Sequence, residues 1–123
     1  MSKSRTIVLI EDEPEQRSIM QMMLENEGYI VLCADTAEEG LKHIQKSTPD
    51  VVVTDVKMSG MDGFSLFEHV RQNLHLENLP FVFATGYNDP GTIREITKLN
   101  ATAYVTKPYD PLDLMQIIDK LTM

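Results

Sequence analysis

Cysteine is nearly missing from this chain, in which Cys33 is the single example. An internal disulfide and a zinc site built from several cysteines are therefore excluded, and a reducing compartment is expected. Long apolar runs are missing as well, so the sequence predicts neither the apolar region of a signal peptide nor a membrane-spanning helix. We therefore expect a cytoplasmic protein that has no membrane partner.

Basic residues are also scarce, with 11 lysines and arginines against 19 acidic residues and a net charge of −8. Binding to nucleic acid needs clustered basic side chains, so direct nucleic-acid binding is not expected. The length of 123 residues fits one domain. We expect a single domain over residues 1–123, with a short N-terminal tail over 1–5 and no segment left for an effector domain.

Five apolar runs rich in β-branched residues predict five strands. They are Thr6–Ile10, Tyr29–Cys33, Val51–Asp55, Leu79–Ala84 and Ala103–Thr106. A helical pattern follows each run, and in the first of these helices Ile19, Met20, Met23 and Leu24 recur at helical spacing. This alternation predicts an α/β fold, in which a doubly wound parallel sheet of order 2-1-3-4-5 carries helices on both faces.

Two kinds of signal mark the helix starts. Pro14, Pro90 and Pro111 suit the first turn of a helix. Thr36 and Glu39 form a possible capping box for the second helix, although Asp35 could cap it instead.

Chemically useful side chains follow four of the predicted strands. Glu11 and Asp12 follow the first strand, Asp55 ends the third, Thr85 begins a loop after the fourth, and Lys107 follows the fifth. A parallel sheet places all these positions at one edge, and open α/β sheets bind their ligands at that edge.

The three carboxylates of this set would repel one another. At an effective dielectric near 20, two like charges about 4 Å apart cost about 4 kcal/mol, which Lys107 alone cannot offset. A divalent cation can, and oxygen ligands favour Mg²⁺ or Mn²⁺. Acids after strands can also be ordinary helix caps, and this is our interpretation of Glu13 and Glu15.

A carboxylate beside such a cation can attack phosphorus and form an acyl phosphate. Asp55 is the candidate nucleophile. Lys107, the hydroxyl of Thr85 and the backbone N–H of Gly86 could then bind the phosphoryl oxygens, because phosphoryl transfer depends mainly on positioning and charge neutralisation.

With these residues in place, the chain resembles the receiver domain of two-component response regulators over essentially its whole length. The matching segments are Ile7–Pro14, Thr54–Asp55, Met58–Gly63, Ala84–Gly86 and Lys107–Tyr109. The resemblance implies a flavodoxin-like, CheY-like (βα)5 fold. It also implies that Asp55 is the phospho-acceptor and that Lys107 is the family's invariant lysine, followed by a cis peptide bond to Pro108.

The resemblance implies further roles at the same edge. Asp12 is expected to bind Mg²⁺, with Mn²⁺ as a substitute, and Glu11 to act on the metal directly or through water. The backbone carbonyl of Lys57 would be another ligand. Thr85 and Tyr104 resemble the switch pair, whose hydroxyl moves toward the phosphoryl group while the aromatic ring turns inward.

The partners follow from the same resemblance. The phosphoryl donor would be a phosphohistidine on a sensor histidine kinase or a histidine phosphotransfer protein. The chain would also dephosphorylate itself slowly, without being an enzyme in the ordinary sense. An unknown output partner would bind the fourth helix, fifth strand and fifth helix.

Three alternatives stay open at this stage. The first is a receiver-like module that binds partners without phosphorylation. The second is an aspartate-nucleophile phosphatase, although Lys57 stands where such enzymes have a second aspartate as general acid. The third is a flavin-binding protein, although Glu11–Glu13 would repel the flavin phosphate.

Four positions also bear on this resemblance. Ser59 replaces the family's usual proline, and Gly86 replaces a common alanine. Lys57 and Tyr87 flank the path of hydrolytic water in similar domains.

Overall fold

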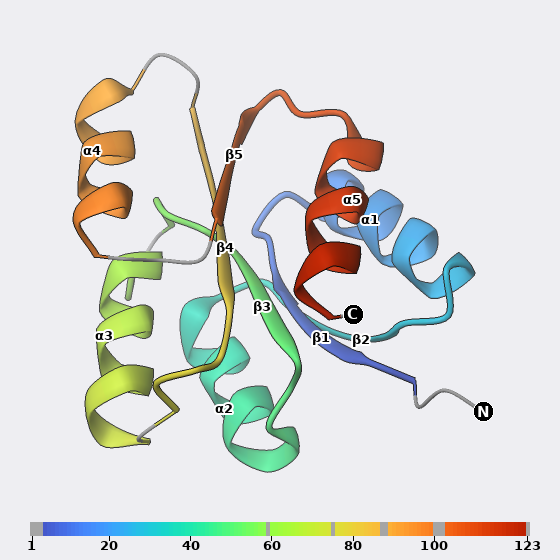
Figure 1. Ribbon diagram of the computed structural model, residues 1–123, viewed down its shortest axis with the longest axis horizontal. Helices are drawn as coiled ribbons and strands as arrows, with labels where there is room; N and C mark the ends of the chain where they lie inside the picture. The colour runs from blue at the N-terminus through green and yellow to red at the C-terminus, as the bar shows by residue number, and fades with distance from the viewer. Residues whose placement is uncertain (1–3, 59, 75, 87–88, 100–102, 123) are drawn as a thin grey trace.

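The fold was analysed in a computed structural model, which describes residues 4–58, 60–74, 76–86, 89–99 and 103–122. Five parallel strands form one sheet of order β2-β1-β3-β4-β5, as the sequence predicts (Figure 1). The strands are β1 (Thr6–Ile10), β2 (Ile30–Ala34), β3 (Val51–Asp55), β4 (Phe81–Gly86) and β5 (Ala103–Lys107). The helices are α1 (Pro14–Asn26), α2 (Ala37–Ser47), α3 (Gly63–Asn73), α4 (Pro90–Lys98) and α5 (Pro111–Leu121).

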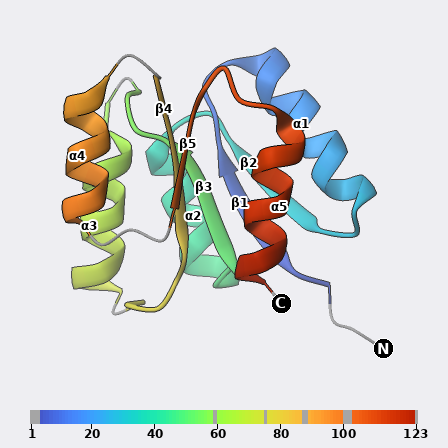
Figure 2. The same ribbon diagram turned by 45° about the horizontal axis from the view of Figure 1, so that its top comes forward.

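Helices cover both faces of the sheet, with α1 and α5 on one side and α2, α3 and α4 on the other (Figures 1 and 2). Successive residues of a strand point to opposite faces. In β1, Ile7 and Leu9 therefore join the core under α1 and α5, whereas Val8 and Ile10 join the core on the other side. This explains why β1, β3 and β4 are mostly apolar: both of their faces are buried.

Side chains that precede the helices fix where the helices begin. The hydroxyl of Thr36 accepts a hydrogen bond from the backbone N–H of Glu39 at 3.1 Å. Thr36 is thus the N-cap of α2, which leaves Asp35 without this role. Asp89 and Asp110 cap α4 and α5 in the same way, each directly before a proline in the first turn.

The fourth strand begins and ends two residues later than the sequence predicts. Pro80 lacks a backbone N–H and stays outside the strand, although its carbonyl accepts a hydrogen bond from the N–H of Val52. At the other end, Thr85 and Gly86 pair with β5 instead of forming a loop. The backbone of Thr85, a predicted site residue, is therefore part of the sheet.

Two smaller features differ from what the sequence pattern alone indicates. The second strand runs one residue later than predicted, from Ile30 to Ala34. In α1, Met20 and Leu24 are fully buried, but the side chain of Ile19 is 45% exposed. The helical spacing identifies the buried face of α1 but does not fix its edge.

No helix in the described part of the chain is long and apolar enough to cross a bilayer.

Gly63 allows α3 to begin directly against the end of β3. A Cβ atom at this position would lie 2.5 Å from the carbonyl oxygen of Asp55 and 3.1 Å from the Cα atom of Val56. Both atoms belong to the backbone, so they cannot move aside as a flexible side chain would. The N–H of Gly63 also donates to the carbonyl of Val56 at 2.8 Å.

We expect Gly63→Ala to lower the free energy of unfolding by about 1–3 kcal/mol, because the added methyl group forces the backbone apart. Urea denaturation measures the change. Gly91→Ala is the matched control, because Gly91 lies in the first turn of α4 and its Cβ would have no neighbour closer than 3.8 Å. This control should be neutral or slightly stabilising, and equal losses in both variants would contradict the argument.

Candidate functional site

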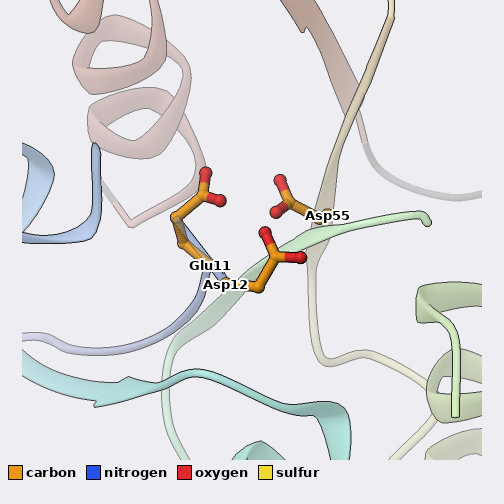
Figure 3. A group of neighbouring side chains, drawn as sticks. All are labelled: Glu11, Asp12 and Asp55. Carbon is orange, nitrogen blue, oxygen red and sulfur yellow. The ribbon is translucent and has the colours of Figure 1, made fainter. Parts of the chain in front are cut away.

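The candidate site lies where β1 and β3, adjacent in the sheet, come to an end. Ile10 pairs with Thr54, so the residues that follow each of them, Glu11 and Asp55, emerge side by side. Figure 3 shows the carboxylates of Glu11, Asp12 and Asp55 around one space, and one oxygen from each lies within 4.8 Å of the others. Glu11 and Asp55 are 2% and 5% exposed, whereas Asp12 is open to solvent.

The ammonium group of Lys107 completes this acidic cluster. Its Nζ atom lies 2.8 Å from Oδ1 of Asp55 and 3.1 Å from Oε1 of Glu11. Lys107 ends β5, two strands away from Asp55, and its backbone pairs with Gly86 of β4. The structure therefore brings four predicted site residues from three strand ends into one ionic cluster.

Backbone contacts hold the two buried acids in place. Oε2 of Glu11 accepts a hydrogen bond from the N–H of Glu13 at 3.1 Å, and the carbonyl of Glu11 accepts one from Arg17 at 2.8 Å. The hydroxyl of Thr54 donates to the carbonyl of Asp55 at 2.9 Å. Sequence reasoning missed the role of Arg17, which lies on the first turn of α1 with no motif around it.

The crowding of charges shifts the pKa values of the cluster. Burial, together with the neighbouring carboxylate of Glu11, raises the pKa of Asp55 to about 7. Burial also acts to raise the pKa of Glu11, but hydrogen bonds from Asp55 and Glu13 and the charge of Lys107 lower it overall. One proton is thus shared by the pair and resides mainly on Asp55.

The same surroundings also shift the pKa of Lys107. Burial acts to lower its pKa, but hydrogen bonds and charge from Asp55 and Glu11 raise it overall. Lys107 therefore keeps its charge throughout the range in which Asp55 titrates.

A cavity of about 150 Å³ opens beside Asp55, and Lys57, Ala84, Thr85, Gly86 and Lys107 form the rest of its wall. Because a water molecule takes about 30 Å³ in the liquid, this space has room for a group of several heavy atoms. Thr85 is 4% exposed. A phosphoryl group attached to Asp55 would therefore extend into this cavity, beside Lys107 and Thr85.

Tyr104, a predicted site residue, does not line the cavity beside Asp55. Its side chain is 41% exposed, and it lines a separate hollow together with Tyr109, Asp110 and Asp113. The peptide bond between Lys107 and Pro108 is cis, as the resemblance implied.

A side chain of α2 contacts the segment that lies between β3 and α3. Oε2 of Glu38 accepts a hydrogen bond from the N–H of Met61 at 3.2 Å, next to Gly60, whose φ angle is +79°. This contact joins Met61, which lies between β3 and α3, to α2. Ser59, which replaces the family's usual proline, and Tyr87, which flanks the path of hydrolytic water in similar domains, lie outside the described residues.

The donor set fits a small hard cation. Carboxylate oxygens are the ligands that Mg²⁺ prefers, and at about 2.1 Å from an octahedral ion adjacent ligands lie about 3.0 Å apart and opposite ligands about 4.2 Å apart. The three oxygens here lie within 4.8 Å of one another, so an inward movement of about 1–2 Å would bring them to such separations. The proton shared by Glu11 and Asp55 also marks an excess of negative charge that a cation would relieve.

Comparison with known sequences identifies the family of this site. Residues 7–119 match the response regulator receiver domain. The chain belongs to this family. Receiver domains of the family bind Mg²⁺ in an acidic pocket and interact with sensor histidine kinases, and this chain has an acidic cluster of Glu11, Asp12 and Asp55.

Relatives of this receiver include small proteins and longer regulators. It is 35% identical, over 93% of its length, to an uncharacterized 14.6 kDa protein of Leptolyngbya boryana, of which it covers 87%. It is 30% identical over 98% of its length to the response regulator Rre1 of Synechocystis, of which it spans about half, 53%. The chemotaxis response regulator CheY4 of Vibrio cholerae has the same fold, with a TM-score of 0.87, 26% identity and coverage of 97% and 99% of the two chains.

The raised pKa of Asp55 predicts how the stability of this receiver depends on pH without metal. Between the ordinary pKa of 3.8 and about 7, the native state keeps a proton that the unfolded state releases. This contribution to the free energy of unfolding is therefore lost as the pH rises. From about pH 5 to about pH 8, above the lowered pKa of Glu11 and below the raised pKa of Lys107, both groups stay charged in the native state and their contributions change little.

We compare the free energy of unfolding of Asp55→Asn with that of the wild type. The value for the variant minus the value for the wild type should increase by on the order of 1 kcal/mol between about pH 5 and about pH 8. Urea denaturation in metal-free buffer at both pH values measures this difference. Asp50→Asn is the control. The carboxylate of Asp50 lies away from the cluster and accepts a hydrogen bond from the N–H of Thr6. A difference between wild type and Asp55→Asn that stays constant with pH would contradict the shared proton.

Proposed function

We propose that this receiver accepts a phosphoryl group from a phosphohistidine onto Asp55, in a Mg²⁺-dependent reaction, and that phosphorylation switches its output surface. One observation carries the proposal. The buried carboxylate of Asp55 lies 2.8 Å from the Lys107 ammonium, within 4.8 Å of two further carboxylates, and beside a cavity of about 150 Å³. A nucleophile, a cation for the transferred group and space for that group thus occur together.

The chemistry follows from these positions. A carboxylate oxygen of Asp55 attacks phosphorus, the bond from phosphorus to the donor imidazole nitrogen breaks, and its electron pair stays on that nitrogen. The product is an acyl phosphate. Lys107 stabilises the negative charge on one phosphoryl oxygen, and the Thr85 hydroxyl with the N–H of Gly86 binds another. In the slow self-catalysed dephosphorylation, water attacks the same phosphorus and the bond from phosphorus to the Asp55 oxygen breaks, which releases inorganic phosphate and restores the carboxylate.

Glu11, Asp12 and Asp55 would hold the Mg²⁺ ion, with Mn²⁺ as a substitute and with the backbone carbonyl of Lys57 as a further ligand. The bound ion supplies positive charge that neutralises the carboxylates and the incoming phosphoryl oxygens. Of the three acids, Asp12 is exposed and therefore accessible to an ion that keeps several of its waters.

The switch is assigned to Thr85 and Tyr104. These residues lie on adjacent strands, where Tyr104 pairs with Phe83 and Thr106 pairs with Thr85. A movement of the Thr85 hydroxyl toward the phosphoryl group would leave space that the exposed ring of Tyr104 can fill. The surface formed by α4, β5 and α5 would change in consequence and present a different face to the output partner.

The partners of the reaction follow from the phosphohistidine donor, which would be carried by a sensor histidine kinase or by a histidine phosphotransfer protein. Residues 1–123 would act as one receiver domain, located in the cytoplasm, where the single Cys33 stays reduced. The net charge of −8 disfavours direct contact with nucleic acid.

A phosphatase reaction is less well supported by the same geometry. An aspartate-nucleophile phosphatase needs a carboxylic acid two residues after the nucleophile, to protonate the leaving group. That position is Lys57, whose ammonium pairs with Asp89 at 2.8 Å. A charged lysine held in this way supplies no acid for the leaving group.

The proposed function predicts one phosphoryl adduct per chain after incubation with Mg²⁺ and a small phosphodonor such as acetyl phosphate. Intact mass spectrometry detects the adduct, which should be absent in Asp55→Asn and strongly reduced by EDTA. Asp50→Asn should be labelled as the wild type is, because Asp50 lies at the opposite end of β3. Equal labelling of wild type and Asp55→Asn would overturn the assignment, and turnover of a phosphate monoester would favour the phosphatase.

The shared proton predicts that Mg²⁺ binding releases protons. Because the pKa of Asp55 is about 7, the affinity for Mg²⁺ should fall below that pH, by up to about tenfold per pH unit. Calorimetric titrations in buffers of different ionisation enthalpy measure both the affinity and the number of protons released. Asp12→Asn should weaken binding at every pH, and binding that does not depend on pH would contradict the coupling.

A further inference from the structure

An ion pair outside the acidic cluster joins the candidate site to the start of α4. Nζ of Lys57 lies 2.8 Å from Oδ2 of Asp89, and the two side chains are 78% and 27% exposed. Lys57 is two residues beyond Asp55, and Asp89 directly precedes α4. Among the ion pairs of the described residues, this is the one that connects the segment after β3 with another helix.

Asp89 has a second role, because it caps α4. Its Oδ1 accepts a hydrogen bond from the N–H of Thr92 at 3.2 Å, and its Oδ2 accepts one from the Thr92 hydroxyl at 2.7 Å. The hydrogen bonds from Lys57 and Thr92 lower the pKa of Asp89 to about 2, so its charge persists at physiological pH. Lys57 therefore contacts the oxygen that also holds the first turn of the helix.

Few other contacts hold α4 in place. Ile96 is the one fully buried side chain of this helix, whereas α2, α3 and α5 each bury three or more residues. Arg94, Glu95 and Lys98 on α4 are exposed to solvent. A single surface ion pair can therefore make a measurable difference to the position of the first turn of α4.

Lys57 also forms part of the cavity wall beside Asp55, together with Thr85 and Lys107. A phosphoryl group on Asp55 would bring roughly two negative charges and several acceptor oxygens into this cavity. The Lys57 ammonium would then have two anions within reach of its flexible side chain, and the phosphoryl group is more highly charged than the carboxylate of Asp89.

We propose that Lys57 is a charge-operated latch, which holds Asp89 and the start of α4 while Asp55 is unmodified and moves to the phosphoryl group when Asp55 is phosphorylated. This inference rests on the proposed function. It makes Lys57 a positioning residue that couples the phosphorylation site to α4, by a route separate from Thr85 and Tyr104.

The test uses the full chain and four variants: Lys57→Met, Asp89→Asn, their combination, and Asp55→Asn. Asparagine retains an oxygen that can cap α4 but lacks the charge that holds Lys57. The probe is beryllium fluoride with Mg²⁺, which mimics a phosphoryl group on a carboxylate and reaches a true binding equilibrium. Hydrogen exchange of the backbone over residues 90–94 reports on the start of α4.

The latch predicts that substitutions of Asp89 and Lys57 change the affinity for beryllium fluoride in opposite directions. An exposed ion pair contributes a free energy that corresponds to about 1.4- to fivefold in an equilibrium constant. Asp89→Asn should tighten beryllium fluoride binding within that range, because Lys57 no longer has to leave a partner. Lys57→Met should weaken binding, and Asp89→Asn should have no effect in the Lys57→Met background.

Hydrogen exchange should change in the same direction in both single variants. Without the probe, each should speed exchange over residues 90–94 by a similar factor of about 1.4 to five, because each breaks the same pair. With the probe bound, the wild type should reach the faster rate as well. A pair with a merely structural role would alter exchange without producing opposite changes in affinity.

Two substitutions serve as matched controls. Lys42→Met removes a lysine of similar exposure, 71%, whose partner Glu39 lies 3.9 Å away on α2. Asp110→Asn alters the N-cap of α5 in the way that Asp89→Asn alters that of α4. Both should bind the probe as the wild type does.

The outcomes separate the latch from the underlying function. If the wild type bound no beryllium fluoride and formed no adduct with acetyl phosphate, or if Asp55→Asn did both equally well, the proposed function would fail and the latch with it. If the wild type bound the probe and Asp89→Asn bound it with unchanged or weaker affinity, the latch alone would be overturned.

Discussion

The contact on which the site depends is the one between the Lys107 ammonium and the two buried acids, Glu11 and Asp55. Two carboxylates with almost no exposure to solvent can lie side by side only because a cation lies 2.8 Å from one and 3.1 Å from the other. Even so, the balance is incomplete, and a proton stays on Asp55 at a pH where an ordinary aspartate is ionised. The residual excess of negative charge makes the site receptive to a metal ion.

This cluster is a direct product of the order of the strands. The parallel strands β1, β3 and β5 end at the same edge of the sheet, where they bring together the carboxylates of Glu11 and Asp55 and the ammonium group of Lys107. The positions that provide them are 96 residues apart in the sequence, from Glu11 to Lys107. A parallel sheet can bring such distant residues together without any local motif at the site itself.

The sequence alone predicted the strands and the meeting of Glu11, Asp12, Asp55 and Lys107, because apolar runs and the residues after them are local signals. The order of the strands was taken from the doubly wound fold class. The sequence could not predict the pairing of Lys57 with Asp89, or the contact of Arg17 with the carbonyl of Glu11. Those depend on where side chains from different elements come to rest. The end of β4 was also missed, since pairing of Thr85 and Gly86 with β5 overrides their preference for a loop.

The division of the interior into two cores has a consequence for how this protein can diverge. The hydrophobic side chains under α1 and α5 do not mix with those under α2, α3 and α4, because the backbone of the sheet lies between them. Substitutions on the two sides share few partners, and their effects on folding should add independently. Natural selection can therefore remodel one flank for a new recognition task while the opposite flank needs no compensating replacements.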